Sequence, residues 1–162
     1  MTERDTENDS LWKEGHPAER ERVLYPDQYA ISTLAWIGDA VFELYVRLRL
    51  AENGRLAGSG ALHKTAITFV SAHGQSLLMD KLLQAEQNGL ILLDDREHNL
   101  LRRARNYHTE STPKNADIRD YRIATAFEAL IGWLWVSGNR DRADTLIRFV
   151  LKDLRPDSSG KE

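Results

Sequence analysis

The sequence has no cysteine among its 162 residues. Disulfide bridges, thiolate metal sites and a cysteine nucleophile are therefore excluded. It also lacks any uninterrupted apolar run close to the roughly 20 residues that a membrane-spanning helix needs. Residues 1–9 are acidic and polar, with none of the apolar character of a secretion signal. These absences predict a cytoplasmic protein with no membrane partner.

A strong net charge is also lacking, because 22 basic residues face 25 acidic ones and leave a formal charge of -3. Such a balance does not by itself indicate a nucleic-acid-binding protein. The charges are unevenly distributed, however. Residues 1–20 are mainly acidic, whereas residues 102–122 carry twice as many basic as acidic side chains. The basic segment is either a binding surface for a polyanion or simply a solvated charged loop.

Alternating strand patterns and internal repeats are absent, and the apolar residues recur at helical spacing. Residues 23–155 are expected to form one all-α domain of about six or seven helices, between a disordered acidic tail (1–22) and a flexible tail (156–162). The first helix is apolar on nearly all sides in its N-terminal half, which predicts a central buried helix. The expected helices cover about residues 29–52, 58–68, 71–87, 94–106, 117–136 and 141–154.

Two acidic residues stand out because each lies inside an apolar helical segment. Asp39 lies within residues 34–44, and Glu128 lies within residues 124–133. A carboxylate in such surroundings costs free energy unless it is paired or binds a metal ion. Gly38 and Gly132 lie close to the two acids, and small residues allow two helices to approach closely. We therefore expect the two helices to cross there and to bring both carboxylates together.

Two carboxylates without cysteine favour Mg²⁺, or alternatively Mn²⁺, over zinc. Mg²⁺ commonly uses one or two protein carboxylates and keeps room for a phosphate group. Together with the basic segment, the pair of acids predicts a metal-dependent phosphodiesterase. A purely structural interpretation is the alternative: each acid would pair with an arginine, such as Arg47 or Arg122, or face a dimer partner.

Several motifs resemble the ribonuclease III family. Residues 34–47 (LAWIGDAVFELYVR) are similar to the signature helix of its catalytic domain, and residues 125–132 (TAFEALIG) to its second acidic motif. More narrowly, residues 62–64 (LHK), 102–106 (RRARN) and 113–117 (PKNAD) resemble Mini-ribonuclease III, and the likeness covers about residues 28–154.

The resemblance implies an all-α homodimer with one active site in each subunit. It also implies Mg²⁺-dependent cleavage of both strands of double-stranded RNA, with the precursor of 23S ribosomal RNA as the usual substrate. By this resemblance, Asp39 and Glu128 are the catalytic residues and the metal ligands. The chain departs from full-length ribonuclease III at Ala35 and Thr125, where that family has two more acids. Mini-ribonucleases III share this reduction.

No double-stranded RNA-binding module is expected after residue 154, so the catalytic dimer must hold its substrate itself. A-form RNA is recognised mainly through phosphates and 2′-hydroxyls. Because the catalytic dimer alone makes few contacts with the RNA, we expect binding to be sensitive to salt or to need a ribosomal protein as a partner. The alternative function is a non-catalytic helical RNA-binding or ribosome-assembly module with a depleted metal site. The expected RNA-contacting residues are Lys64, Arg102, Arg103, Arg105, Asn106, Lys114 and Asn115.

Overall fold

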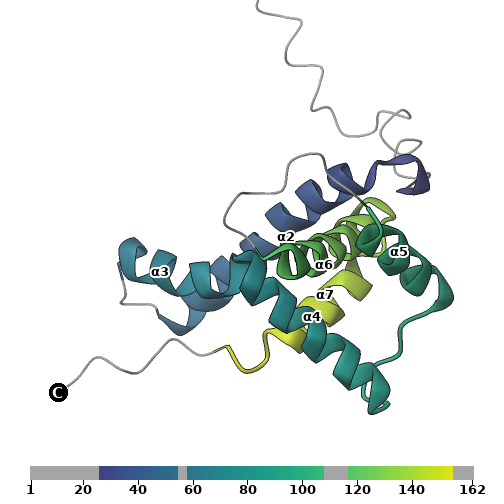
Figure 1. The fold of residues 1–162 in the computed structure, drawn as a ribbon. Coiled ribbons are helices and arrows are strands. Elements are labelled where there is room, and N and C mark those ends of the chain that lie inside the picture. The colour runs from purple at the N-terminus through teal and green to yellow at the C-terminus, as the bar shows by residue number, and fades with distance from the viewer. Residues whose placement is uncertain (1–25, 55–57, 108–116, 155–162) are drawn as a thin grey trace, which may run out of the picture.

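The computed structural model describes residues 26–54, 58–107 and 117–154, and within them it contains six α-helices, one short 3-10 helix and no strand (Figure 1). The prediction of an all-α domain is confirmed. The elements are η1 (Pro26–Gln28), α2 (Ile31–Asn53), α3 (Ser59–Val70), α4 (Ala72–Gln87), α5 (Asp95–Arg105), α6 (Ile118–Val136) and α7 (Arg140–Val150).

Local capping signals determine where two of the helices begin. At the start of α5, Asp94 Oδ1 accepts a hydrogen bond from the Glu97 backbone N–H at 2.8 Å, and Glu97 Oε2 accepts one from the Asp94 N–H at 2.9 Å. This reciprocal arrangement is a capping box. At the start of α6, Asp117 Oδ1 accepts from the Arg119 N–H at 2.7 Å. Both helices therefore begin where the sequence predicts.

Helix α6 is the central element, with α2, α4, α5 and α7 packed around it (Figure 1). Phe127 of α6 is fully buried and packs edge-on against Phe42 of α2, with ring centroids 5.1 Å apart. The prediction that the first helix is a central buried helix is wrong for one of its sides in the single chain. On α2, Trp36 is 76% exposed, and Leu44 and Leu48 are each 53% exposed. One apolar stripe of α2 therefore has no partner within the described residues.

The last helix is shorter than predicted, because α7 ends at Val150 rather than at Leu154. The backbone N–H of Leu154 donates to the Leu151 carbonyl at 2.9 Å, which forms a tight turn beyond the helix. This turn lets both Leu151 and Leu154 reach the core, where each is 3% exposed. Burial of two leucines thus outweighs continuation of the helix.

A buried ion pair fixes α5 to the start of α7. Arg142 donates from Nε to Glu97 Oε1 at 2.8 Å and from Nη2 to Glu97 Oε2 at 2.9 Å. The Glu97 side chain is only 2% exposed. The same carboxylate that caps α5 therefore also holds α7 in place.

The predicted tails, residues 1–22 and 156–162, and the segment 108–116 lie outside the described residues. The described part covers most of the predicted domain. No helix in it has the length and apolar character needed to cross a membrane.

Candidate active site

The two acids singled out from the sequence lie where α2 crosses α6, and two glycines make this crossing tight. A Cβ atom on Gly38 would lie 1.8 Å from the backbone oxygen of Glu128. A Cβ atom on Gly132 would lie 1.9 Å from the backbone oxygen of Leu34. Neither distance is possible for a real side chain, so only glycine fits at both positions. The prediction that the helices cross at small residues is confirmed.

The crossing places Asp39 and Glu128 within hydrogen-bonding reach of each other. Burial, and then the negative charge of Asp39, raise the pKa of Glu128 to about 8. Burial, and then the charge of Glu43, also raise the pKa of Asp39. The metal-free pair therefore retains a proton at neutral pH, which Glu128 holds and donates to Asp39.

The structural alternative, in which Arg47 neutralises one of these acids, is not what the structure shows. Arg47 Nη2 lies 2.5 Å from Glu43 Oε1, one turn along the same helix. Asp39 and Glu128 instead hydrogen-bond each other and Gln75. Two acids with these partners form a site that a cation could neutralise.

Gln75 of α4 is a site residue that the sequence interpretation missed. It is 1% exposed, and its Nε2 donates to Asp39 Oδ1 at 3.4 Å. The side chain also hydrogen-bonds Glu128. The signal was present in the sequence, because Gln75 lies on the same helical stripe as the buried residues Met79 and Leu82. A glutamine in a core-facing stripe indicates a polar partner inside the protein.

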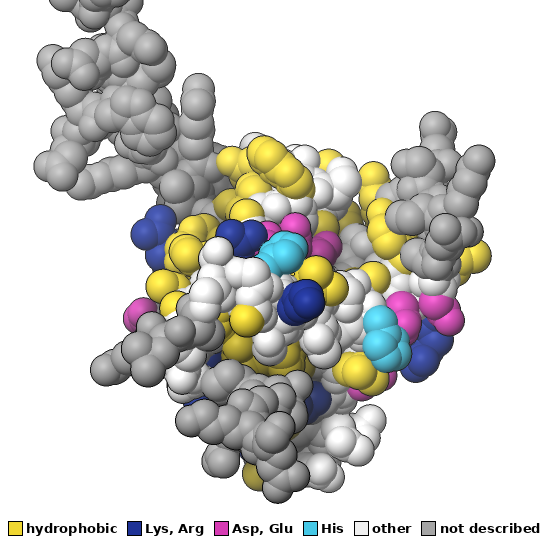
Figure 2. All heavy atoms as spheres, turned by 90° about the vertical axis from the view of Figure 1, so that its left-hand side faces the viewer, with side chains coloured by type: hydrophobic (Ala, Val, Ile, Leu, Met, Phe, Trp, Pro, Cys, Tyr) yellow, Lys and Arg dark blue, Asp and Glu magenta, His cyan; other side chains and the backbone are white. Residues whose placement is uncertain are grey.

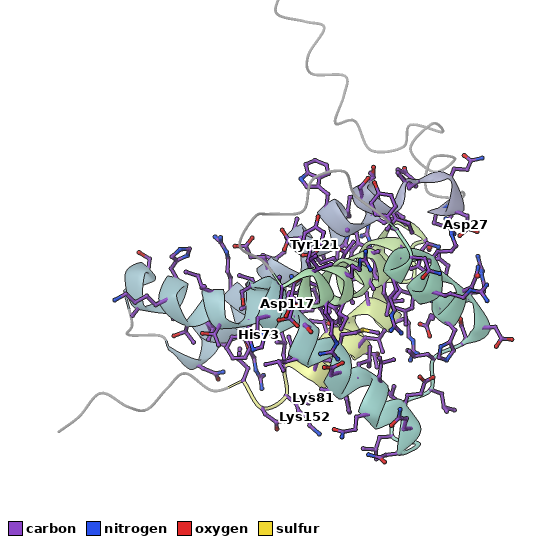
Figure 3. The ribbon with its side chains drawn as sticks, viewed as in Figure 1. Asp27, His73, Lys81, Asp117, Tyr121 and Lys152 are labelled. Carbon is purple, nitrogen blue, oxygen red and sulfur yellow. The ribbon has the colours of Figure 1, made fainter. Side chains whose placement is uncertain are left out.

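A second polar pair lies nearby, where α4 and α6 begin. His73 Nδ1 lies 2.8 Å from Asp120 Oδ2. Hydrogen bonds from His73 and then from Ser76 lower the pKa of Asp120. Figure 3 places His73 close to the first turn of α6, where Asp117 and Tyr121 are labelled. On the face shown in Figure 2, acidic side chains lie beside a histidine and basic side chains and are bordered by hydrophobic ones.

Comparison with known proteins identifies the family. The model of the ribonuclease III domain matches residues 32–139. The chain belongs to the ribonuclease III family. It is similar to Mini-ribonuclease 3 of Brevibacillus brevis, with 41% identity over 115 residues, which cover 71% of this chain and 80% of that protein.

Further relatives support the same assignment. Mini-ribonuclease 3 of Enterococcus faecalis is 36% identical over 119 residues, covering 74% of this chain and 86% of the relative. A crystal structure of a protein from Fusobacterium nucleatum is similar with a TM-score of 0.65 and 28% identity, covering 80% of this chain and 97% of that one. The resemblance to Mini-ribonuclease III is thus confirmed, and the chain is an endoribonuclease of the ribonuclease III type.

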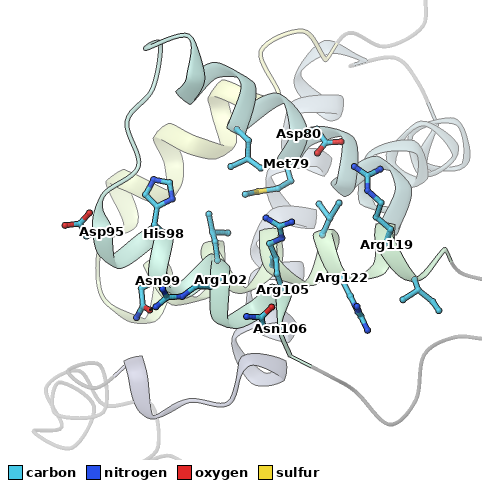
Figure 4. A pocket seen from close by; sticks show the side chains of 15 residues that line it. Met79, Asp80, Asp95, His98, Asn99, Arg102, Arg105, Asn106, Arg119 and Arg122 are labelled. Carbon is cyan, nitrogen blue, oxygen red and sulfur yellow. Dashed lines mark hydrogen bonds between the residues drawn. The ribbon is translucent and has the colours of Figure 1, made fainter.

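In this member of the family, part of the predicted RNA-contacting set lines a cavity of about 1050 Å³ between α4, α5 and α6 (Figure 4). Arg102, Arg105 and Asn106 line it, together with Arg119 and Arg122 of α6. The sequence analysis did not predict Arg119 and Arg122 as RNA contacts, because nothing local shows that α6 turns them toward α5. The apolar part of the lining includes Met79, Leu83, Leu101, Ile123 and Ala126.

The remaining predicted contacts are not part of this cavity. Lys64 is exposed on α3, and Arg103 is exposed on α5 without lining the cavity. Lys114 and Asn115 lie outside the described residues. The structure therefore brings together only some of the predicted set.

The cavity and the acid pair lie on different sides of α6. At about 100° per residue, Arg119 and Ala126 lie roughly 180° and 160° around the helix from Glu128. The described residues contain no group of three or more His, Asp or Glu side chains that could hold a metal ion. Within that part of the chain, the candidate metal ligands are the two carboxylates predicted from the sequence, Asp39 and Glu128.

Proposed function

We propose that the protein cleaves double-stranded RNA with Mg²⁺, or Mn²⁺ in its place, bound by Asp39 and Glu128. The observation that supports this most directly is the pair of adjacent acids, in which burial and then the charge of Asp39 raise the pKa of Glu128 to about 8. Hard carboxylate oxygens are suitable ligands for either cation. A divalent cation bound there would supply the Lewis acidity that phosphodiester hydrolysis requires.

The residues have distinct parts in this proposal. Glu128 must release its proton before both carboxylates can bind a cation, so binding and deprotonation are coupled. Gly38 and Gly132 let the two backbones approach closely and so set the spacing of the two acids. Because carboxylates on two rigid helices need little rearrangement, the site is preorganised for its ligand.

Cleavage of a long double-stranded RNA tests this proposal. We expect cutting with Mg²⁺, none with EDTA, and a loss of roughly 100-fold or more in Glu128→Gln and Asp39→Asn, since even groups that only support a ligand change affinity or activity 10- to 100-fold. Glu52→Gln, which alters an exposed acid at the end of α2, should cut normally. An Asp39→Asn variant as fast as the parent would disprove the assigned role. Binding without cutting by the parent would favour the RNA-binding or ribosome-assembly module.

The cavity between α4, α5 and α6, which Arg102, Arg105 and Arg119 line, is proposed to bind RNA phosphates. Arg102 Nη2 donates to the neutral Asn99 Oδ1 at 2.7 Å and so keeps its charge available for an anion. Because the cavity lies on the other side of α6 from Glu128, a phosphate there would not be the one that is cut. Asn106 lines the same cavity, whereas Lys64, Arg103, Lys114 and Asn115 would contact RNA outside it.

The salt dependence of RNA binding tests this phosphate-binding role separately from catalysis. In the cleavage-deficient Asp39→Asn background, Arg102→Ala plus Arg105→Ala should weaken RNA binding and reduce the slope of log K against log salt by about one to two. Arg148→Ala is a matched control, because Arg148 is already paired with Asp144 at 2.8 Å on α7. An unchanged slope in the double variant would show that the cavity does not hold phosphates.

A homodimer is proposed through the exposed apolar stripe of α2. Trp36, Leu44 and Leu48 follow one another along this stripe and are all exposed in the single chain. Large exposed apolar groups in a row mark an association surface. Two copies would supply one acid pair for each RNA strand. Trp36→Glu should convert the dimer to a monomer in sedimentation experiments, and a monomeric parent protein would contradict the proposal.

The substrate is proposed to be the precursor of 23S ribosomal RNA, bound directly or with the help of a ribosomal protein. Similarity to proteins named Mini-ribonuclease 3 supports this, and a cytoplasmic location is consistent with such a substrate. Residues 23–155 would form the catalytic domain, with tails on either side. Accumulation of uncut precursor in cells that lack the protein, reversed by the parent but not by Glu128→Gln, would test the assignment.

A further inference from the structure

The buried amide of Gln75 lies where the two acids meet. Its Nε2 donates to Asp39 Oδ1 at 3.4 Å, and the side chain also bonds Glu128. With 1% of its surface exposed, Gln75 is almost completely removed from solvent. Three residues on three different helices, α2, α4 and α6, therefore form one polar cluster.

The backbone around Gln75 is positioned by tight local packing. Ser71 caps α4, and its Oγ accepts a hydrogen bond from the Gly74 N–H at 3.1 Å. A Cβ on Gly74 would lie 2.0 Å from the backbone oxygen of Thr68 in α3, so α3 and the start of α4 are in close contact. Gln75, the residue after Gly74, therefore has little freedom to move away from Asp39 and Glu128.

A glutamine at this position is expensive if its only role is to fill space. Burying an amide without hydrogen bonds costs free energy, and ordering a long unbranched side chain costs more. The next residues on the same stripe, Met79 and Leu82, are apolar and buried. An apolar residue would pack there as they do, so the amide indicates a role toward the two carboxylates.

We propose that Gln75 is the positioning residue of the cation site: its neutral amide holds Asp39 and Glu128 in one arrangement and keeps the charge of the ionised site at two. The inference rests on the proposed metal-dependent function. An amide is suited to this part because its NH₂ group donates two hydrogen bonds without adding charge. A carboxylate in its place would add a third negative charge, and an alkyl group would leave the acids without a donor.

The direct test is the affinity for Mn²⁺ at a fixed pH, measured by the electron paramagnetic resonance signal of free Mn²⁺. This readout does not depend on RNA or on turnover. We expect Gln75→Leu to weaken Mn²⁺ binding about 10-fold or more and Gln75→Glu to strengthen it by a similar factor. If Gln75→Leu does not fold, the near-isosteric Gln75→Glu still tests the charge argument.

Matched controls come from the same helix. Gln84 is exposed on α4, so Gln84→Leu and Gln84→Glu make the same chemical changes away from the acids and should leave Mn²⁺ affinity within about twofold of the parent. Thermal unfolding without metal reports any packing effect of each variant separately.

The outcomes distinguish this inference from the proposed function. If the parent binds Mn²⁺ and Asp39→Asn does not, but both Gln75 variants keep the parent's affinity, Gln75 only packs the core and the inference is wrong. If the parent itself binds no Mn²⁺, the proposed metal site fails and the inference fails with it. Tighter Mn²⁺ binding by Gln75→Glu together with weaker Mn²⁺ binding by Gln75→Leu is the result that supports both the proposed metal site and the role of Gln75.

Discussion

Replacing Glu128 by glutamine should stabilise the metal-free protein, and the gain should increase with pH. Burial, reinforced by the charge of Asp39, raises the pKa of Glu128 from its ordinary value of 4.5 to about 8. Between these two values the folded chain holds a proton that the unfolded chain has lost. The contribution of Glu128 to stability is therefore highest below pH 4.5 and is lost as the pH rises through 8. Glutamine has no proton to release and escapes this penalty.

The size of the effect follows from the two pKa values. At about 1.4 kcal/mol for each pH unit, a pKa raised from 4.5 to about 8 gives an upper limit of roughly 5 kcal/mol above pH 8. Glu128 is only partly buried by solvent-exposed area, so we expect about half of this limit. For a domain of this size, 1 kcal/mol changes the unfolding temperature by about 2–4 °C. Glu128→Gln should thus unfold about 5–10 °C higher than the parent at pH 9.

The assay is unfolding by heat and by urea at pH values from 4.5 to 9, with EDTA present. The difference between Glu128→Gln and the parent should be small at pH 4.5 and largest at pH 9. Glu52→Gln, in which an exposed acid is changed, should show no such trend. A difference that is the same at both ends of the pH range would show that Glu128 is ionised at neutral pH, and the reasoning would be refuted.

Three further predictions follow from the same contacts. Below pH 8 the apparent Mg²⁺ affinity measured by calorimetry should rise up to about 10-fold per pH unit, because the cation displaces the proton of Glu128; an affinity independent of pH would contradict this. Gly38→Ala should lower the free energy of unfolding by about 3 kcal/mol or more, because its Cβ would clash with a backbone oxygen at 1.8 Å, whereas Gly60→Ala, with nothing within 4 Å, should not. Glu97→Ala should cost about 3 kcal/mol by leaving Arg142 without its buried partner, and urea unfolding would show a loss well below 1 kcal/mol if the pair contributes little.

The parts of the fold that the sequence predicts are those with local causes. Asp94 and Asp117 cap the helices that follow them because each side chain reaches backbone N–H groups two or three residues ahead. Gly38 and Gly132 predict the tight crossing because a glycine inside an apolar helix lets another backbone approach closely. These signals are complete within a few residues, so they need no knowledge of the partner helix.

The parts that the sequence does not predict depend on contacts between distant segments. Trp36 is apolar, yet it is exposed in the single chain, since the apolar pattern of α2 does not say which side α6 will cover. Gln75 becomes a site residue only because α4 passes the crossing of α2 and α6. Arg119 and Arg102 face one cavity only after α5 has packed on α6.

The site and the core of this protein are built from the same contact, which limits how each can change. The glycines that let α2 and α6 pack most closely also set the distance between Asp39 and Glu128. Two acids at the tightest point of the core destabilise the metal-free fold, and a cation that binds only the folded chain would reverse that loss by mass action. A variant that removes the cost of ionising a buried acid, such as Glu128→Gln, should therefore be more stable without metal and lose the stabilisation that metal confers. A higher stability without metal together with a smaller stabilisation by metal would show that the free energy lost by burying the two acids is recovered when the cation binds.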